Sequence, residues 1–286
     1  MATPPARSAR LPLVAAVLVG LAVLVSGCSP AATTERPVSL ATRAPAVTAP
    51  PANGRFDYQI GGGYRPAAGV RIVTRDRGER SPAGRYGICY VNAFQTQPED
   101  AAFWRRHPTL VLRRHGAPVR DPDWPGESIL DIGTAAKRAA IAAIEYRWID
   151  GCRRSGFRAV EPDNLDTYTR FPELTRADAV AFATLLARRA HARGLAIGQK
   201  NTAELGTAAR KAVGFDFAVA EECQVYAECD DYTRTYGAHV IEIEYTDQPR
   251  RFFTEACRQH GARISVTLRD RDVVPKGAKG YHDASC

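Results

Sequence analysis

The sequence lacks the residue spacings that would indicate a metal site, a nucleic-acid surface or phosphodiester chemistry. No Cys-x-x-Cys pair and no Cys/His ligand pattern occurs among its seven cysteines and six histidines, which disfavours zinc. No basic run is interleaved with aromatic residues, so we expect no nucleic-acid partner. The predicted strand ends carry no pair of histidines, which argues against phosphodiester cleavage. We therefore expect a protein that needs neither a metal nor a cofactor.

Lysine is scarce as well, because 5 of the 39 basic residues are Lys and the rest are Arg. This imbalance reflects a compositional bias, and it weakens any functional interpretation of the net charge of +8. Removal of the N-terminal leader takes away two arginines and no acid, which leaves +6. We expect this charge to be a solvated surface.

The N-terminus has the parts of an export signal. Arg7 and Arg10 form a positive region, and the apolar run 11–25 is shorter than the roughly 20 residues that span a bilayer. Val25 to Cys28 match a bacterial lipobox, in which the Cys28 thiol receives a lipid. We therefore expect a lipoprotein signal peptide over residues 1–28, export, and anchoring to the outer face of the membrane. The alternative is cleavage near Gly27 without a lipid, which gives a secreted protein.

A linker and one domain follow the leader. Residues 29–53 are rich in Pro, Ala, Thr and Ser, and such a segment buries too little apolar surface to offset its ordering entropy. We therefore predict a disordered linker over 29–53. The remaining residues, 54–286, suit one α/β domain better than two smaller ones.

Six cysteines remain beyond Cys28, and an even number in an exported protein favours disulfides. Cys223 and Cys229 are close enough in sequence to clip a small loop that begins near Glu221. The sequence leaves the pairing of the other four open.

Short β-type runs alternate with helical patterns, which predicts a parallel sheet wrapped by helices. Helices are expected over 134–154, 175–194 and 249–260, the second beginning with a capping box at Thr175 and Asp178. Eight strands are expected, the number that closes a (β/α)8 TIM-type barrel. Their ranges are 56–60, 70–74, 86–93, 157–160, 195–199, 215–220, 240–245 and 263–268.

Carboxylates stand where two of these strands end. Glu161, Asp163 and Asp166 follow the strand that ends at 160, and Glu221 and Glu222 follow the strand that ends at 220. Carboxylates are costly to bury and easy to direct into a cleft at such positions. Two strand ends that face one another across a barrel mouth would supply the acid and the nucleophile or base of glycoside hydrolysis.

A series of short segments occurs in order along most of the domain. They are Trp124 to Glu127, Leu130 to Ile132, Glu161 to Asp166, Ala190-His191, Gly194-Leu195, Lys200-Asn201, Phe215 to Val219, Glu221, Cys223, Tyr226, Glu228-Cys229 and Glu244-Tyr245. Through these segments the residues from Tyr58 to Tyr245 resemble glycoside hydrolase family 114, the endo-α-1,4-polygalactosaminidases, which implies a TIM-type barrel.

Carried over by position, the catalytic pair of the family falls on Asp163 and Glu221. The chain has Ala220-Glu221-Glu222-Cys223 where the family usually has Asn-Glu-Gln-Cys, so Glu222 is a rival for Glu221. Strand alternation alone does not decide between Glu221 and Glu222. Further residues are expected to contact substrate because they lie at strand ends or within the matched segments: Glu161, Asp166, Lys200, Asn201, Glu222, Tyr226, Glu244, Tyr90, Asn92, Trp124 and Asp131.

The leader predicts an exported protein, which we expect to be a monomer, and the resemblance implies a glycoside hydrolase that cleaves internal α-1,4 linkages of a galactosamine-containing polysaccharide. A separation of about 5 Å between the two carboxyl groups would indicate retention, and about 6.5 Å or more inversion. The sequence leaves one alternative of another class, a non-catalytic glycan-binding lipoprotein built on the same barrel.

Overall fold

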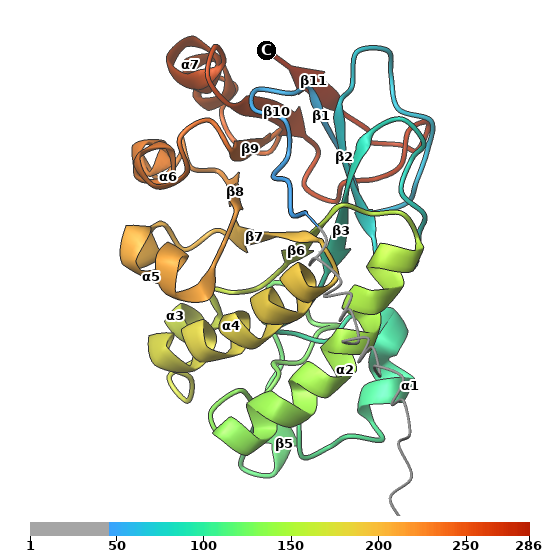
Figure 1. Ribbon diagram of the computed structural model, residues 1–286, viewed down its shortest axis with the longest axis vertical. Coiled ribbons are helices and arrows are strands. Elements are labelled where there is room, and N and C mark those ends of the chain that lie inside the picture. The colour runs from blue at the N-terminus through green and yellow to red at the C-terminus, as the bar shows by residue number, and fades with distance from the viewer. Residues whose placement is uncertain (1–45) are drawn as a thin grey trace, which may run out of the picture. The chain divides into compact units, whose positions relative to one another are not determined.

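The computed structural model describes residues 46–286, and within them eight parallel strands follow one another around a barrel (Figure 1). All eight predicted strands are confirmed, with bounds that differ by a few residues. They are β1 (Phe56–Gln59), β2 (Ile72–Asp76), β3 (Tyr86–Val91), β6 (Ala159–Pro162), β7 (Ala196–Lys200), β8 (Phe217–Glu221), β9 (Val240–Tyr245) and β10 (Ser265–Arg269). The antiparallel strand β11 (Asp283–Ser285) pairs with β10, and the ladder stays open between β10 and β1 in the described residues.

Helices cover the outside of the strands (Figure 1). The predicted helices are present as α2 (Ala135–Arg154), α4 (Arg176–Ala192) and α7 (Arg251–His260). The capping box of α4 is formed, because the Thr175 hydroxyl accepts from Asp178 N–H while the Asp178 carboxylate accepts from Thr175 N–H. The pattern missed four short helices, which offer few turns for a periodicity to appear: α1 (Ala101–Trp104), α3 (Thr167–Arg170), α5 (Gly206–Val213) and α6 (Cys229–Tyr236).

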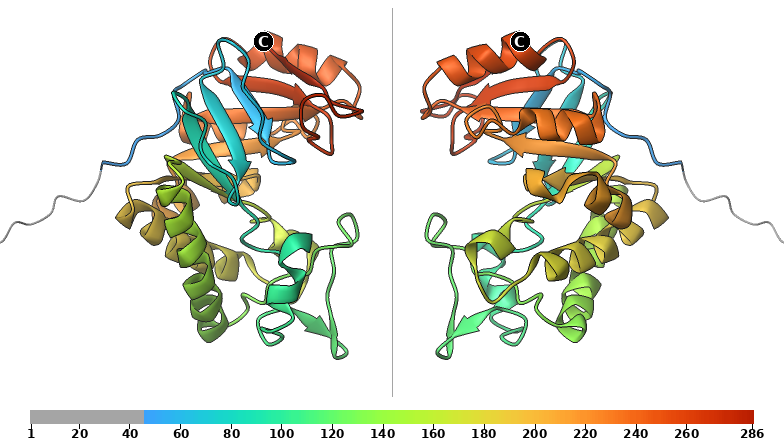
Figure 2. Two further views of the ribbon diagram at one scale, coloured as in Figure 1. Left: turned by 90° about the vertical axis from the view of Figure 1, so that its right-hand side faces the viewer. Right: turned by 90° about the vertical axis from the view of Figure 1, so that its left-hand side faces the viewer.

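The long connection from β3 to α2 was not anticipated in its details. It holds α1, the one-turn 3₁₀ helix η1 (Pro98–Asp100) and a two-stranded hairpin of β4 (Arg113–Arg114) and β5 (Ala117–Pro118). Figure 2 shows this connection on one side of the barrel, away from α7. Trp124 and Glu127 lie in its last part, so it brings residues to the functional end of the barrel.

Two apolar cores hold the barrel together. The inner core alternates along the strands, as Phe56 and Tyr58 do on β1 and Phe217 and Val219 on β8, while a larger outer core lies between strands and helices. Gly198 on β7 belongs to the inner face, and a Cβ there would meet the Phe217 ring at 2.9 Å, so the missing side chain makes room for that ring.

The same alternation decides which side chains reach the carboxyl end of the barrel. On β8 the inward series Phe217 and Val219 continues to Glu221, and on β9 the series Ile241 and Ile243 continues to Tyr245. Active sites of such barrels lie at this end, because the loops that follow the strands meet there.

Three disulfides use the six cysteines of the described domain. The predicted pair Cys223–Cys229 is confirmed. The two pairings that the sequence left open are Cys89–Cys152, which ties β3 to α2, and Cys257–Cys286, which ties α7 to the C-terminus. Each disulfide restricts the unfolded chain.

The predicted signal peptide (1–28), its lipid-bearing Cys28 and most of the linker lie outside the described residues. The end of the linker needs a correction, because residues 46–53 pack on the barrel. Val47 contacts the inner core, the Thr48 carbonyl accepts from the Tyr86 hydroxyl, and the Pro50 carbonyl accepts from His239. Their apolar side chains cover the end of the barrel, so the domain begins near Val47. Among the residues described, none of the helices has the length and hydropathy needed to cross a bilayer.

Candidate active site

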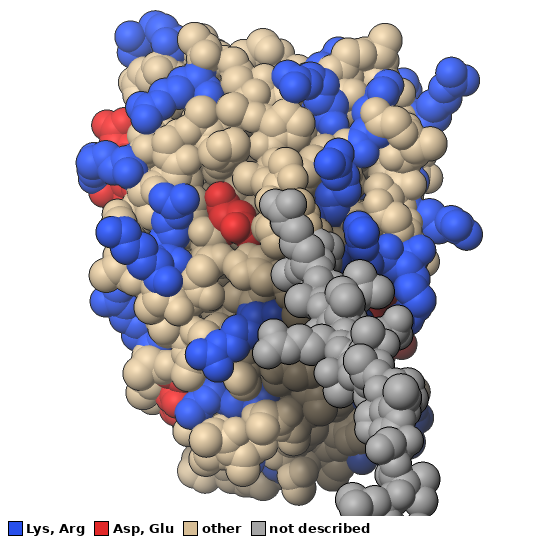
Figure 3. All heavy atoms as spheres, viewed as in Figure 1, with Lys and Arg blue, Asp and Glu red and all other residues tan. Residues whose placement is uncertain are grey.

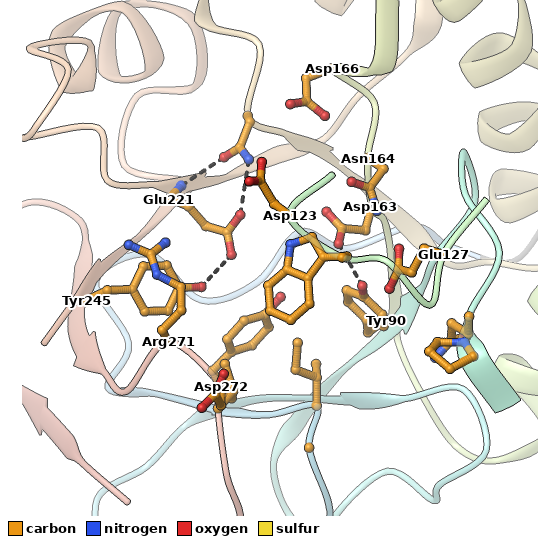
Figure 4. Close-up of a pocket in the computed structure, with 18 of the residues that line it drawn as sticks. Tyr90, Asp123, Glu127, Asp163, Asn164, Asp166, Glu221, Tyr245, Arg271 and Asp272 are labelled. Atoms are coloured by element: carbon orange, nitrogen blue, oxygen red, sulfur yellow. Dashed lines mark hydrogen bonds between the residues drawn. The ribbon is translucent and has the colours of Figure 1, made fainter. Parts of the chain in front are cut away.

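A cavity of about 470 Å³ opens at the carboxyl end of the strands (Figure 4). Side chains from most of the barrel strands and from the β3–α2 connection line it. The lining polar residues include Tyr90, Asp123, Glu127, Asp163, Asn164, Asp166, Arg170, Asn201, Glu221, Tyr245 and Arg271. The sequence therefore converges on one hollow from segments that lie far apart in the chain.

Asp163 and Glu221 point into this hollow from two sides (Figure 4). Tyr90 donates its hydroxyl hydrogen to Asp163 Oδ2 over 2.6 Å, and Tyr245 donates to Glu221 Oε1 over 2.5 Å. Asn201 holds Glu221 further, because its side chain donates to Oε2 and accepts from the backbone N–H of Glu221. Each carboxylate is thus fixed by one phenol, and its other oxygen faces a partner that the two carboxylates share.

That partner is the ammonium group of Lys200, which lies beneath the cavity floor. Its Nζ is 3.2 Å from Asp163 Oδ1 and 3.4 Å from Glu221 Oε2. These two oxygens are therefore no more than about 6.6 Å apart. The ammonium also contacts the buried Glu161 at 3.0 Å.

The surroundings of Asp163 favour its ionised form. Burial alone would raise the pKa of Asp163, but the Lys200 charge and hydrogen bonds from Tyr90 and from the N–H of Asn164 outweigh it, so the pKa lies below its usual value. Burial likewise opposes the charge on Lys200, yet the surrounding carboxylates raise its pKa well above the usual value, so it stays an ammonium. Glu161 is fully buried, and its pKa is raised mainly by that burial.

The turns that follow three neighbouring strands adopt a backbone conformation that side chains other than Gly rarely take. Asn164, Asn201 and Glu222 have φ values of 64°, 48° and 57°. Each stands one to two residues beyond the end of β6, β7 or β8. Such strain tends to collect at functional sites, where the surrounding structure over-determines the backbone. The strain agrees with a site at this end of the barrel.

Glu127 lines the cavity, although the sequence pattern did not predict it as a site residue. Burial raises its pKa to about 7, and the charges of Asp163 and Asp121 add to this, against a hydrogen bond from Asn92. The predicted contact Asn92 is itself buried, and its amide links Glu127 to Asn164. Asn92 therefore orients two lining residues and does not face the hollow.

A second hollow of about 430 Å³ adjoins the first and shares Asp166, Asn201 and Glu221 with it. Glu222 and the strongly exposed Tyr226 line it, and both stand in or beside the loop that Cys223–Cys229 closes. Glu222 is held by Arg271 in a two-point ion pair of 2.6 and 3.0 Å. Glu221 thus faces the region where the two hollows meet, whereas the carboxylate of Glu222 is bound to Arg271.

The structure brings most of the predicted residues together. Asp163, Glu221, Tyr90, Asn201, Trp124 and Asp166 line the first hollow, and Glu222 and Tyr226 line the second. Glu161 and Lys200 lie directly beneath. Asn92 orients lining residues from behind, and the other two predicted contacts, Asp131 and Glu244, lie elsewhere.

Asp131 does not reach either hollow. Its carboxylate forms an ion pair with Lys137 of α2 and accepts from Gly133 N–H, so it stabilises the start of that helix. The expectation that it contacts substrate is corrected to a structural role. Its place in a matched segment gave no information on the direction of its side chain.

Glu244 is also on the wrong side of the barrel wall. Because Ile241, Ile243 and Tyr245 face inward, Glu242 and Glu244 face outward. Glu244 accepts from Gln224 N–H, and Glu242 lies beside the sulfurs of Cys223 and Cys229. These sulfurs are joined to one another, so the group offers no thiolates to a metal.

Sequence reasoning missed Tyr245, Tyr58, Arg170 and Arg271 as site residues. The alternation on β9 could have identified Tyr245 in place of Glu244, and that on β1 could have identified Tyr58, whose hydroxyl contacts both Glu161 and Lys200. Arg271 follows β10 and has no sequence signal of its own.

Charge is distributed unevenly between the cleft and an outer face. Figure 3 shows Lys and Arg spread over the face seen in Figure 1, with few acidic residues among them. Ten carboxylates line the two hollows, against only Arg170 and Arg271. They are Glu99, Asp123, Glu127, Asp163, Asp166, Glu204, Glu221, Glu222, Glu228 and Asp272. The cleft is therefore acidic although the chain is basic.

Comparison with solved structures finds proteins similar to this chain. The Aspergillus fumigatus Ega3 complex with galactosamine has 25% identity and a TM-score of 0.67, and the match covers 84% of this chain and 99% of that chain. The glycoside hydrolase domain of PelA from Pseudomonas aeruginosa has 16% identity and a TM-score of 0.54, covering 78% and 96%. At that identity the second likeness shows the fold alone.

A comparison with curated protein sequences found no match. A family model for glycoside-hydrolase family GH114 matches residues 37–286, which is most of the chain and all of the barrel. The resemblance seen in the sequence, the barrel and its carboxylate-lined hollow agree with this match. The chain belongs to glycoside-hydrolase family GH114.

Proposed function

We propose that this glycoside hydrolase cleaves internal α-1,4 linkages of a galactosamine-containing polysaccharide through Asp163 and Glu221. The observation that carries the proposal is the pair of carboxylates held on opposite sides of one open hollow by a shared lysine. Family membership and the likeness to the Ega3 complex with galactosamine support the choice of substrate. Arg170 and Arg271 also each hold two acids, but only one acid of each of those pairs lines the hollows.

Asp163 is the nucleophile in this proposal, and Glu221 is the acid and base. A nucleophile must be ionised, and the surroundings of Asp163 lower its pKa. The two facing oxygens lie no more than about 6.6 Å apart, a bound that includes the roughly 5 Å of retaining enzymes and only just reaches the range of inverting ones, so it favours a retaining mechanism. Glu127, with a pKa of about 7, is proposed to donate a hydrogen bond to the sugar.

The cleft geometry supports cleavage within a chain. The hollow continues from the Trp124 side past Glu221 to the Tyr226 side, so a polymer can pass the reacting pair. The excess of carboxylates suits sugars with free amino groups, which carry positive charge at neutral pH. The negative charge in the cleft would offset the repulsion between the basic protein and a cationic glycan.

The test is the release of reducing ends from partly acetylated α-1,4-galactosaminan, with the first product followed by proton NMR. We expect short oligosaccharides whose new reducing end is first the α-anomer, and slower cleavage as acetylation increases. A β-anomer as first product would refute retention. A wild-type protein that binds the polymer but releases no sugar would favour the rival function, a glycan-binding protein without turnover.

Two exposed aromatic residues are expected to bind sugar rings on the two sides of the reacting pair. Trp124 and Tyr226 are 48% and 63% exposed, and each lines one hollow. Aromatic faces at the rim suit the apolar face of a sugar ring, so each change to Ala should lower kcat/KM on polymer by about 5–10-fold, mostly through KM. The half-buried Phe252 on α7, which lines neither hollow, is the control as Phe252→Ala. A loss equal to that of the control would refute sugar binding by these residues.

Export and lipid attachment at Cys28 complete the proposal, on the strength of the leader sequence. Expression of the full chain with labelled fatty acid should give a labelled protein in the membrane fraction. The Cys28→Ala variant should carry no label. A labelled Cys28→Ala variant, or an unlabelled wild type, would contradict the anchor.

A further inference from the structure

The ammonium of Lys200 has more acceptors than hydrogens. Four oxygens lie within reach of its Nζ: Glu161 Oε1 at 3.0 Å, Tyr58 Oη at 3.1 Å, Asp163 Oδ1 at 3.2 Å and Glu221 Oε2 at 3.4 Å. An ammonium has three hydrogens to donate, so at any moment one of these oxygens is left without one. The choice among them can change by rotation about the last bond of the side chain, without movement of the backbone.

Two of the four acceptors are inert and two react. Glu161 and Tyr58 are fully buried below the hollow, and they hold the amine in place from beneath. Asp163 and Glu221 are partly exposed to the hollow, and each has its second oxygen fixed by a tyrosine hydroxyl. Lys200 itself is 1% exposed, so water does not screen its charge.

The proposed reaction moves one negative charge between these two acceptors. In the first step an Asp163 oxygen bonds to the anomeric carbon, the glycosidic C–O bond breaks, and the leaving oxygen takes the proton of Glu221. Asp163 becomes a neutral ester and Glu221 becomes a carboxylate. In the second step Glu221 takes a proton from water, the water oxygen bonds to the anomeric carbon, and the ester electron pair returns to Asp163.

We infer that Lys200 is a positioning residue that follows this charge, pairing with Asp163 before the first step and with Glu221 after it. The inference rests on the proposed function and adds a residue that touches no atom of the sugar in the reaction. The total charge around the ammonium is the same in both states, so the buried site keeps its electrostatic balance through the cycle. Without Lys200, the intermediate would hold a Glu221 carboxylate with no cation in contact.

The variant Lys200→Met tests this with a pH profile and a separation of kcat from KM. The other titratable groups around Asp163 and Glu221 are Tyr58, Tyr90, Glu127, Glu161, Asp166 and Tyr245. None of them supplies a positive charge, and the two arginines that line the hollows are held in other ion pairs, Arg170 with Asp121 and Asp166 and Arg271 with Glu222 and Asp247. The acid limb of kcat/KM should therefore move up by at least about one pH unit. Because the second step depends on the Glu221 carboxylate, kcat should fall at least about 30-fold and KM should fall with it.

The Lys200→Met variant needs a control for folding, because the change leaves the buried Glu161 without a cation and can destabilise the protein. The double variant Glu161→Gln with Lys200→Met removes both buried charges and keeps similar shapes. If circular dichroism shows that the single variant does not fold, the pH profile is measured on the double variant. The acid limb of its kcat/KM profile should move to higher pH in the same way. Glu161→Gln alone keeps the ammonium and should not move the acid limb upward.

A folded variant without Lys200 whose acid limb and KM match those of the wild type would overturn the inference. That outcome leaves the proposed function standing, since polymer cleavage by the wild type is measured first. Failure of the wild type to cleave galactosaminan would instead remove the proposed function. The two failures are therefore distinguishable in one set of assays.

Discussion

Replacing Asp163 by Asn is expected to lower kcat/KM on galactosaminan by at least about 10³-fold, with no loss of folded protein. The amide cannot form the ester, and it cannot carry the charge that Lys200 and Tyr90 stabilise. Because Asn has nearly the shape of Asp, the Tyr90 contact and the fold should persist. Polymer binding measured by calorimetry should change little, which separates loss of chemistry from loss of structure.

The matching change Glu221→Gln should lower kcat/KM on polymer by a similar factor. On an aryl glycoside or a glycosyl fluoride, kcat/KM should fall much less. Such leaving groups depart without a proton, so the first step no longer depends on the acid. Glu222→Gln is the control, since Glu222 is bound to Arg271 and faces the second hollow. If Glu222→Gln were inactive and Glu221→Gln active, the catalytic pair would be wrongly assigned.

Replacing Glu242 by Gln is expected to make the protein more stable than the wild type at pH 8. Glu242 is fully buried on the outer side of β9, where its carboxyl group lies beside that of Glu244 and contacts no cation among the described residues. Burial, with the charge of Glu244 added, raises the pKa of Glu242 well above its usual value. The folded protein therefore holds this proton at a pH where the unfolded chain has released it.

The sign of the effect follows from that difference. A raised pKa stabilises the fold fully below the usual Glu value of 4.5, and the contribution is lost as the pH rises toward the folded-state pKa. The loss is about 1.4 kcal/mol per pH unit for each proton held only by the folded state. The Gln side chain carries no such proton. The unfolding free energy of the Glu242→Gln protein should therefore fall less steeply than that of the wild type between pH 5 and pH 8.

Urea unfolding at several pH values between 5 and 8 measures this slope for both proteins. Glu99→Gln, at an exposed carboxylate, is the control and should keep the wild-type slope. Parallel slopes for Glu242→Gln and the wild type would mean that Glu242 is ionised in the folded protein, against the geometry described here.

The strands and the catalytic end of the barrel could be predicted because they depend on local pattern. Apolar runs at regular intervals fixed the eight strands, and the carboxylates after β6 and β8 indicated where the site would form. The direction of a side chain within a strand was predictable only where the inner face was known. On β9 that alternation places Tyr245 on the inner face and Glu244 on the outer face, so the strand-end position of Glu244 did not make it a site residue.

Other features depend on contacts between distant segments, which no local pattern encodes. Lys200 meets Asp163 and Glu221 only because β6, β7 and β8 are neighbours in register. Arg271 reaches Glu222 from the far end of the chain, and two of the three disulfides join separate elements. The packing of Val47 on the inner core likewise has no signal in a segment of linker-like composition.

The most direct measurement identifies the carboxylate that carries the sugar when the reaction is stopped halfway. The Glu221→Gln variant lacks the base of the second step, so an activated α-galactosaminyl fluoride should leave it covalently glycosylated. Proteolysis and mass spectrometry of the labelled protein then locate the sugar. We expect a single adduct on Asp163. An adduct on Glu127 or Glu161, or no adduct together with an inverted product, would contradict the assignment of Asp163 and Glu221 as the reacting pair.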